Sequence, residues 1–294
     1  MLWLILGLIC AFFYALYHLA NKKYIKNADA SYFAFCGILM TVIIILPFLP
    51  YLWPKFVFNW TVIISFVIVG IMVVITRQLY MHSIKIEDVS ITTPLLTITP
   101  LFTLIIGMVW LKEFPSYMGI IGIAFLVTGT YFLNYKKRKD GILEPFKLIF
   151  RNKGSLYMFI VAFIFGIGSV MDKFIINNSN YITHAMIYNY FVIPLFAAYL
   201  LVKDKPCLFI SKTKDTFKAH WKGLLITSLI YFVVMLSYIV AISLTYTVYI
   251  ISIKRVSAIF TIIIAYFVLK EKDNFWHILF GTVLMVLGVV LMVI

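Results

Sequence analysis

Charged side chains, and acidic ones above all, are scarce in this sequence. Charged residues make up 12% of its 294 positions, whereas hydrophobic residues make up 64%. A soluble domain carries about 25% charged residues, so this chain lacks the polar side chains needed to cover a surface that faces water. The mean hydropathy of +1.04 agrees with this reading. The composition therefore excludes a soluble fold and indicates one integral membrane body.

The sequence also lacks the motifs of known catalytic chemistry. Its eleven Asp and Glu residues lie nearly all at the ends of apolar runs, which leaves few ligands for a metal. No HExxH, GxSxG, Walker A or aspartate-rich prenyl-diphosphate motif occurs. We therefore predict no enzyme activity, no catalytic residue, no metal site and no cofactor. Any uphill transport would have to draw on an ion gradient or an exchange gradient.

Few cysteines are present, and the first apolar run is not predicted to be a cleavable leader. The three cysteines are odd in number and lack metal-ligand spacing, so we interpret them as packing residues. The first apolar run starts at Leu2 without a basic region or a small-residue cleavage site, which predicts a retained helix rather than a signal peptide. The net charge of +14 does not indicate nucleic-acid binding, because the basic residues lie between apolar runs and no soluble domain would present them.

Long apolar runs are what this sequence has in abundance. The hydrocarbon core of a bilayer needs about 20 apolar residues per helix. Longer, basic connections lie at 136–153 and 203–221. We therefore predict an all-α integral membrane fold with ten transmembrane helices. The ten runs are 2–20, 31–52, 59–82, 89–111, 116–135, 155–176, 182–202, 222–244, 246–269 and 275–294.

One passage of the sequence occurs twice, at Tyr80–Glu113 and at Tyr238–Glu271. A second, weaker match near the start of each half, at a constant offset, makes chance similarity between apolar helices less plausible. The duplication is typical of transporters that bind their substrate between two homologous halves. The matched pairs are Tyr80 with Tyr238, Ile84 with Ile242, Phe102-Thr103 with Phe260-Thr261, Leu111-Lys112-Glu113 with Leu269-Lys270-Glu271, Gly122 and Gly129 with Gly281 and Gly288 after a slip of one residue, Ala11-Phe12 with Ala162-Phe163, and Asn21-Lys22 with Asp172-Lys173.

The duplication defines the domain organisation. We predict a first repeat at 1–135, a basic cytoplasmic linker at 136–153 and a second repeat at 154–294. Each repeat holds five helices. Because five is odd, the tandem copies must insert in opposite orientations, which makes them inverted-topology five-helix repeats.

The distribution of Lys and Arg predicts how the chain is oriented. On one side only Lys55, Lys112 and Lys173 occur. Cytoplasmic loops carry the excess of Lys and Arg, so we predict a multi-pass protein of the cell (plasma) membrane with a cytoplasmic linker and both termini outside. The basic residues of the other side are Lys22, Lys23, Lys26, Lys85, Lys136, Lys137, Arg138, Lys139, Lys147, Arg151, Lys153, Lys203, Lys205, Lys212, Lys214, Lys218, Lys222, Lys270 and Lys272.

The pattern resembles the drug/metabolite transporter (DMT) superfamily, specifically its EamA-type ten-helix members. In that family each half has a helix that ends in Gly-Glu or Lys-Glu, followed by a fifth helix that contains glycine. The passages Pro100–Glu113 and Ala258–Glu271 fit this description, and the resemblance covers essentially the whole chain. Many relatives hold both termini in the cytoplasm, whereas the charges here predict the reverse. Ala258 stands where the first copy has Pro100, so we expect the second copy to lack a proline kink.

Two adjacent basic residues within the ninth run are the first candidates for substrate binding. Placing Lys254 or Arg255 at mid-bilayer costs about 2.5–3.5 kcal/mol, and such residues usually face a cavity or a partner. Neighbours on a helix point about 100° apart, so we expect Arg255 to face the centre. Lys254 would then snorkel or contact a neighbouring helix. The alternatives are an ion pair with Asp172, a contact with a helix C-terminus, and a contact with lipid phosphate.

Polar residues in the third and first runs extend the predicted substrate site. Arg77 and Tyr80 share one helical face because they are three residues apart, and Gln78 lies beside them. The alternative for Arg77 is snorkelling to the headgroups. In the first run, Tyr14 and His18 form a polar stripe, with plain packing as the alternative for the histidine.

Aromatic and acidic residues of the second half complete the prediction. Tyr188 and Tyr238 are candidates for stacking on a planar or cationic ligand. Asp172 is the candidate coupling residue, because it is the acid closest to lying within a span. The alternative for Asp172 is an interfacial pair with Lys173.

The leading hypothesis is a secondary transporter, not driven by ATP, that carries a small organic metabolite by alternating access about a central cavity. The excess of basic over acidic residues within spans favours an anionic or zwitterionic solute, such as an amino acid, a carboxylate or a phosphorylated metabolite. A lipid or lipid-linked phosphate flippase is one alternative, and an exporter of drug-like or aromatic cations is another. The expected partners are the small-molecule substrate, the lipid bilayer and a coupling proton or counter-substrate, without nucleic acid, for a monomer or homodimer.

Overall fold

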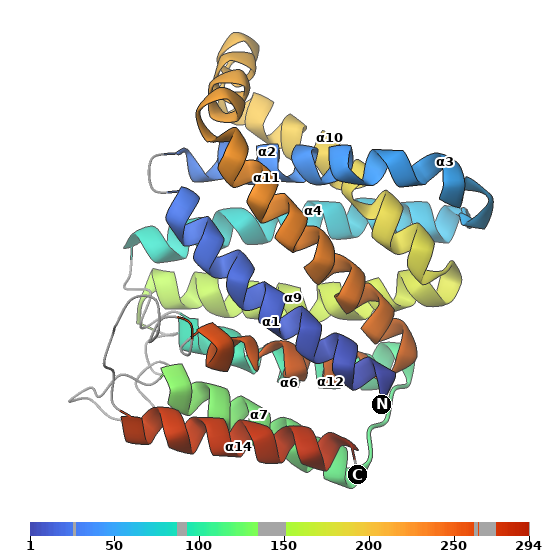
Figure 1. The fold of residues 1–294 in the computed structure, drawn as a ribbon, viewed down its shortest axis with the longest axis vertical. Coiled ribbons are helices and arrows are strands. Elements are labelled where there is room, and N and C mark those ends of the chain that lie inside the picture. The colour runs from blue at the N-terminus through green and yellow to red at the C-terminus, as the bar shows by residue number, and fades with distance from the viewer. Residues whose placement is uncertain (26–27, 87–92, 135–150, 262–263, 265–274, 294) are drawn as a thin grey trace.

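The computed structural model describes all residues except 26–27, 87–92, 135–150, 262–263, 265–274 and 294. Every regular element in the described residues is a helix, as predicted, and most helices lie with their long axes roughly aligned (Figure 1). Six of them are long and apolar enough to cross a membrane by length and composition. The chain is thus a multi-pass membrane protein. The count of ten stays a prediction, because the other runs fall on shorter helices or partly outside the described residues.

The helices divide between the two halves of the chain. The first half contains α1 (Leu2–Tyr24), α2 (Ala30–Ile45), η1 (Leu46–Phe48), α3 (Leu49–Leu52), η2 (Trp53–Lys55), α4 (Trp60–Ile86), η3 (Thr93–Ile98), α6 (Thr99–Ile106), η4 (Gly107–Leu111) and α7 (Tyr117–Asn134). The second half contains α9 (Lys153–Asn178), α10 (Tyr181–Lys203), α11 (Pro206–Leu244), α12 (Thr247–Lys254) and α14 (Phe275–Val293).

The second helix of each half begins with the same kind of cap. The side chain of Asp29 accepts a hydrogen bond from the backbone N–H of Ser31 at 2.9 Å. The side chain of Asn180 accepts one from the backbone N–H of Thr183 at 2.8 Å. Short polar side chains satisfy the N–H groups that are free at a helix start. Asp29 and Asn180 share the offset that relates Ala11 to Ala162, so α2 and α10 start at corresponding positions.

Contacts between the two halves come in matched pairs. Helix α1 packs against α11 and α12, and its counterpart α9 packs against α4 and α6. In the same way α2 packs against α11, and α10 packs against α4. Exchanging the halves therefore leaves this contact pattern unchanged. The largest buried hydrophobic cluster lies between α4, α9, α10 and α11, around Phe66, Ile175 and Ile239.

The fifth helices, α7 and α14, pair with each other in opposite directions. Gly122 lies against Gly288, and Gly129 lies against Gly281, so the residue numbers rise along one helix as they fall along the other. Helix α1 starts and α14 ends at the right-hand end of the bundle in Figure 1, whereas α9 starts at the left-hand end. Helices α1 and α9, the first of each half, thus run in opposite directions in this view.

The predicted loop at 203–221 is wrong, because α11 starts at Pro206 and not near residue 222. The segment is helical up to a kink at His220, where φ is −124° and ψ is 15°. Phe209 packs on one buried cluster and Phe217 on another. Their i, i+8 spacing places both on one face of the helix, as in an amphipathic helix. Lysines on the other face lower its hydropathy, so the segment does not form an apolar run in the sequence. In Figure 1 this segment projects beyond the other helices.

The predicted continuous helix at 246–269 is interrupted. Helix α12 ends at Lys254, and Arg255 and Val256 form a turn with i to i−3 hydrogen bonds to Ser252 (3.0 Å) and Ile253 (2.8 Å). In the first half, η3 gives way to α6 at the corresponding position, Ile98. Both copies are thus irregular at one site, although the second has no proline there. The second copy lacks the proline, as expected from Ala258, but its helix is interrupted nonetheless.

Candidate functional site

Side chains from α1, α9, α10, α11 and α12 meet inside the bundle, in what we call the central cluster. Lys254 lies at the end of α12, with its Nζ atom 4.3 Å from the ring centre of Tyr14 and 4.9 Å from that of Tyr238. Ring faces stabilise an ammonium group through their negative charge density. Lys254 is thereby held between α1 and α11. The cluster comprises Tyr14, Tyr17, His18, Asp172, His184, Tyr188, Tyr231, Tyr238, Lys254 and Arg255.

Arg255 occupies the break that follows α12. Its Nε atom is buried and has no hydrogen-bond partner in the described part of the chain. The positive charges of Lys254 and Arg255 both act on His18, which places the three side chains in one region. The ion pairs between described residues are His184–Asp172 and Lys212–Asp204, so neither cluster cation pairs directly with Asp172. An Arg255 held this way has donors free for another group.

Asp172 makes two hydrogen bonds from the C-terminal part of α9. His184 Nε2 lies 3.0 Å from Asp172 Oδ1, and the Tyr238 hydroxyl donates to Oδ2 at 3.0 Å. Lys173 does not pair with Asp172, because its Nζ atom donates to the backbone carbonyls of Ile242 and Thr245 at 2.6 and 3.1 Å. The interfacial Asp172–Lys173 pair is therefore absent. Tyr238 instead links Asp172 to Lys254, since its hydroxyl bonds one and its ring faces the other.

His184 was not predicted as a site residue. It is 2% exposed and stacks on Tyr188 with 5.4 Å between ring centres and 16° between ring planes. Phe66 contacts its other side at 5.8 Å. A single histidine in an apolar run gives no signal of its partner, because Asp172 lies on another helix. The only sequence clue was its polarity within the seventh predicted run.

Aromatic side chains of α1 continue the cluster toward α11. Tyr14 lies edge-on to His18 with 4.4 Å between ring centres. Tyr17 lies 5.5 Å from Tyr231 of α11 and 6.4 Å from Tyr14. Histidine and tyrosine tips that face one another inside a helical bundle offer hydrogen-bonding groups beside apolar ring faces.

The site candidates on α4 differ in how closely they approach the central cluster. The charge of Arg77 acts on Tyr188 and Tyr231, so it borders the cluster. Tyr80 lies close enough to Tyr14 for a charge on one phenol to affect the other. Gln78 points away from Arg77 by about 100° and takes part in none of the hydrogen bonds between described residues. We therefore retain Arg77 and Tyr80 in the site and leave Gln78 at its edge.

The central cluster keeps accessible surface although it lies inside the bundle. His18 is exposed, and Tyr14, Tyr188, Tyr238 and Lys254 are half-buried. Side chains that face one another across helices and still keep accessible surface can contact water or a small solute. The cluster can therefore offer cationic donors, hydroxyl groups and ring faces to one bound molecule.

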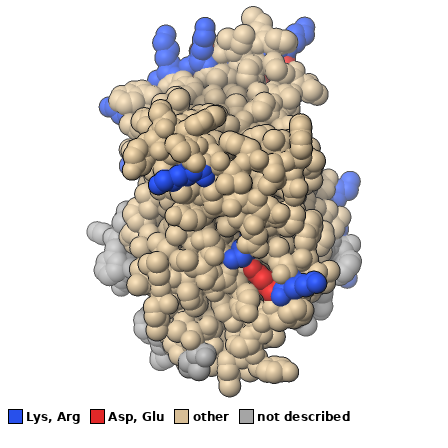
Figure 2. All heavy atoms as spheres, turned by 90° about the vertical axis from the view of Figure 1, so that its right-hand side faces the viewer, with Lys and Arg blue, Asp and Glu red and all other residues tan. Residues whose placement is uncertain are grey.

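A second polar contact closes the junction between α11 and α12. The Glu113 carboxylate accepts hydrogen bonds from the backbone N–H of Thr247 at 2.8 Å and from its hydroxyl at 3.2 Å. Lys173 binds the last carbonyls of α11, as described above. Lys112 has a φ of 55°, a left-handed conformation that turns the chain so that Glu113 reaches α12. The end of the bundle where α1 starts carries few charged side chains, and a small acidic patch there lies between basic ones (Figure 2).

Burial raises the pKa of the Glu113 carboxyl, while its bonds to Thr247 and the charge of Lys173 act in the opposite direction. A carboxyl whose pKa is higher in the folded state stabilises it at low pH, and this contribution is lost as pH rises through the raised value. We expect the stability of the wild-type protein to fall as pH rises above 4.5, the ordinary value. Glu113→Gln should remove that slope while keeping an acceptor for Thr247. Thermal unfolding in detergent across this range measures it, and an unchanged slope in the variant would contradict the prediction.

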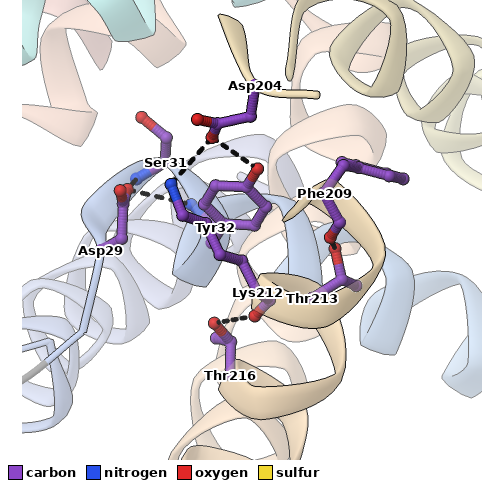
Figure 3. A network of polar contacts seen from close by, with 8 residues as sticks. All are labelled: Asp29, Ser31, Tyr32, Asp204, Phe209, Lys212, Thr213 and Thr216. Atoms are coloured by element: carbon purple, nitrogen blue, oxygen red, sulfur yellow. Dashed lines mark hydrogen bonds and ion pairs between the residues drawn. The ribbon is translucent and has the colours of Figure 1, made fainter. Parts of the chain in front are cut away.

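A third polar network anchors the projecting part of α11 (Figure 3). Asp204 follows α10 and accepts hydrogen bonds from the Tyr32 hydroxyl at 2.8 Å and from Lys212 Nζ at 3.0 Å. Lys212 also lies 5.3 Å from the ring centre of Tyr32. One carboxylate thus joins the start of α2, the end of α10 and the first turns of α11. The network lies apart from the central cluster, so we assign it a structural role.

Hydrogen bonds from Lys212 and Tyr32 hold the pKa of Asp204 below its ordinary value. A lowered carboxyl pKa contributes stability above the ordinary value, and this is lost as pH falls through the lowered one. Asp204→Asn is therefore expected to speed hydrogen exchange at 206–219 near neutral pH. Asp215→Asn is the matched control, because Asp215 is exposed on the same helix and accepts only from Ser211. Equal exchange in both variants would count against the anchor.

Comparison with known proteins supports a family assignment. The model of the EamA-like transporter family matches residues 1–135 and 152–294. A protein of known crystal structure has a similar fold, with a TM-score of 0.72 and 10% identity over 98% of this chain and 95% of that chain. At this identity the likeness concerns the fold alone. No curated protein sequence matches the chain.

Proposed function

Because the chain belongs to the EamA-like transporter family, within the DMT superfamily that the sequence resembles, we propose that it is a secondary transporter working by alternating access. The solute would bind at the central cluster, between the two halves of the chain. Family membership carries the class of function, and no evidence of an enzyme accompanies it. The solute and the cycle are our proposal.

The proposed cycle requires two five-helix repeats of inverted topology. The antiparallel packing of α7 on α14 and the contact pattern that is unchanged when the halves are exchanged both support this arrangement. A pseudo-twofold axis in the membrane plane gives the protein two equivalent conformations, open to opposite sides. The fifth helices would stay peripheral while the other helices of each half rock about the cluster.

The proposed solute is anionic or zwitterionic, such as an amino acid, a carboxylate or a phosphorylated metabolite. The observation that carries this choice is the pair Lys254 and Arg255 at a helix break, with the Nε atom of Arg255 lacking a partner among the described residues. Broken helices near mid-membrane are typical of transporter binding sites, because freed backbone groups and charged side chains can face the solute. A guanidinium binds carboxylate or phosphate through parallel hydrogen bonds, which orients the solute.

A cation exporter fits the cluster less well, because Lys254 already occupies faces of Tyr14 and Tyr238. A lipid flippase would need a basic opening to the bilayer, and no observation favours one. We propose a location in the cell membrane with the linker in the cytoplasm and the termini outside. The scarcity of charge at the end where the termini lie supports that orientation.

A ligand screen on purified protein tests the solute class. Ligands that bind only the folded state stabilise it and so raise its melting temperature. At a ligand concentration of 100 times the dissociation constant, the stabilisation is about 2.7 kcal/mol. We expect stabilisation by members of an organic-acid, amino-acid or sugar-phosphate panel, followed by uptake of the same compounds into proteoliposomes. If only organic cations stabilise the protein and are transported, the proposed solute class is wrong.

A further inference from the structure

Half-buried Asp172 and buried His184 form an acid–base pair that anion binding alone does not explain. Asp172 receives one hydrogen bond from α10 and one from α11. Near it, from the elements packed against α9, lie the charged and titratable groups of Arg77, His184, Tyr188, Tyr231, Tyr238 and, behind the Tyr238 ring, Lys254. Lys173, on the same helix, is directed to the α11 carbonyls. No other carboxylate of the described residues contacts this pair.

The hydrogen bonds of Asp172 and His184 indicate the protonation state of the pair before it takes up a proton. His184 Nδ1 is buried and has no partner in the described part of the chain. A doubly protonated imidazole would leave its Nδ1–H as an unpaired buried donor, whereas a neutral imidazole that donates from Nε2 leaves only a bare acceptor there. The contacts therefore favour an ionised Asp172 beside a neutral His184. One more proton can be taken up by the pair as a unit.

Tyr238 connects this pair to the cationic end of the cluster. Its hydroxyl donates to Asp172 at 3.0 Å, and Lys254 Nζ lies 4.9 Å from the centre of its ring. The negative charge of Asp172 is thus one side chain away from Lys254. An anion that approaches Lys254 is repelled by this charge, and a proton on the pair removes the repulsion.

We propose that Asp172 and His184 are the proton-accepting site of the protein, and that a proton there and an anion at Lys254 and Arg255 strengthen each other's binding. Such linkage is reciprocal, and values of about 5–150-fold are typical. This linkage rests on the proposed function, which supplies the anion. In that case the proton is transported together with the anion. The proton-accepting site itself does not depend on which solute is carried.

Infrared difference spectroscopy tests the site without any solute. Full-length protein in vesicles is titrated from neutral to acidic pH. We expect a protonated-carboxyl band to appear toward low pH in the wild type and to be missing in Asp172→Asn. Asp215→Asn, which removes an exposed carboxyl, should leave that band unchanged. A band identical in wild type and Asp172→Asn, or no band at all, would overturn the proton site.

The link to the cationic end is tested on the same band. Lys254→Met removes the positive charge behind Tyr238, so the carboxyl band should appear at a higher pH than in the wild type. Lys222→Met, which removes an exposed lysine, should not move it. A band that Lys254→Met does not shift would disprove the coupling while leaving the proton site standing. Loss of solute uptake would bear on the proposed function alone, since no solute enters these titrations.

Discussion

Arg255→Ala is expected to abolish uptake of the solute into proteoliposomes while leaving folded protein in the membrane. In the proposed complex, Arg255 forms a buried, hydrogen-bonded charge pair with the anionic solute. Truncating one partner of such a pair costs about 2–5 kcal/mol, which corresponds to a loss of uptake of about 30-fold or more. Folding should survive, because Arg255 pairs with no carboxylate among the described residues. Removing an unpaired charge from an apolar helix lifts an insertion cost of about 2.5–3.5 kcal/mol.

Two further variants separate charge from geometry. Arg255→Lys keeps the positive charge but loses the planar fork that binds a carboxylate or phosphate through two bonds, so we expect partial uptake. Lys222→Met is the matched control, because Lys222 is exposed at the start of the membrane part of α11 and lies over Trp221 at 5.6 Å. Uptake by Arg255→Ala equal to that of the wild type would contradict a role of this side chain in solute binding.

Much of the central cluster could be predicted because charge is rare in this chain. A charge within an apolar run is costly, so Lys254, Arg255 and Asp172 stood out against their surroundings. Tyr14, His18, Tyr188 and Tyr238 followed from helical spacing and residue type. The structure adds how they meet, since Lys254 lies between the rings of Tyr14 and Tyr238.

The parts that the sequence did not reveal depend on contacts between distant segments. Glu113 was visible as the end of a repeated motif, but its partner Thr247 lies in the other half of the chain. His184 is recognisable as a site residue only through its contact with Asp172 on another helix. The helical start of α11 was hidden because lysines dilute its hydropathy, and the break at Arg255 has no proline to announce it. Pairing across helices is set by packing, which a single sequence does not encode locally.

Replacing Gly122 or Gly129 with alanine is expected to destabilise the protein by separating α7 from α14. A Cβ atom at Gly122 would lie 2.6 Å from the carbonyl oxygen of Gly288, and one at Gly129 would lie 2.7 Å from that of Gly281. Both obstacles are backbone atoms, which cannot move aside as a flexible side chain can. Forced overpacking typically costs about 1–3 kcal/mol, and we expect the upper part of that range because two helices must shift together.

The lipid environment makes this interface sensitive to small changes. Apolar side chains gain little by leaving acyl chains for one another, so helices in a membrane associate mainly through close packing of small residues. Gly168→Ala is the matched control, since no atom lies within 4 Å of its added Cβ and alanine favours a helix by about 0.5–1 kcal/mol. Melting temperatures in detergent should fall for Gly122→Ala and Gly129→Ala and hold or rise for Gly168→Ala. If all three variants melt together, the glycine contacts do not hold the fifth helices of the two halves in place.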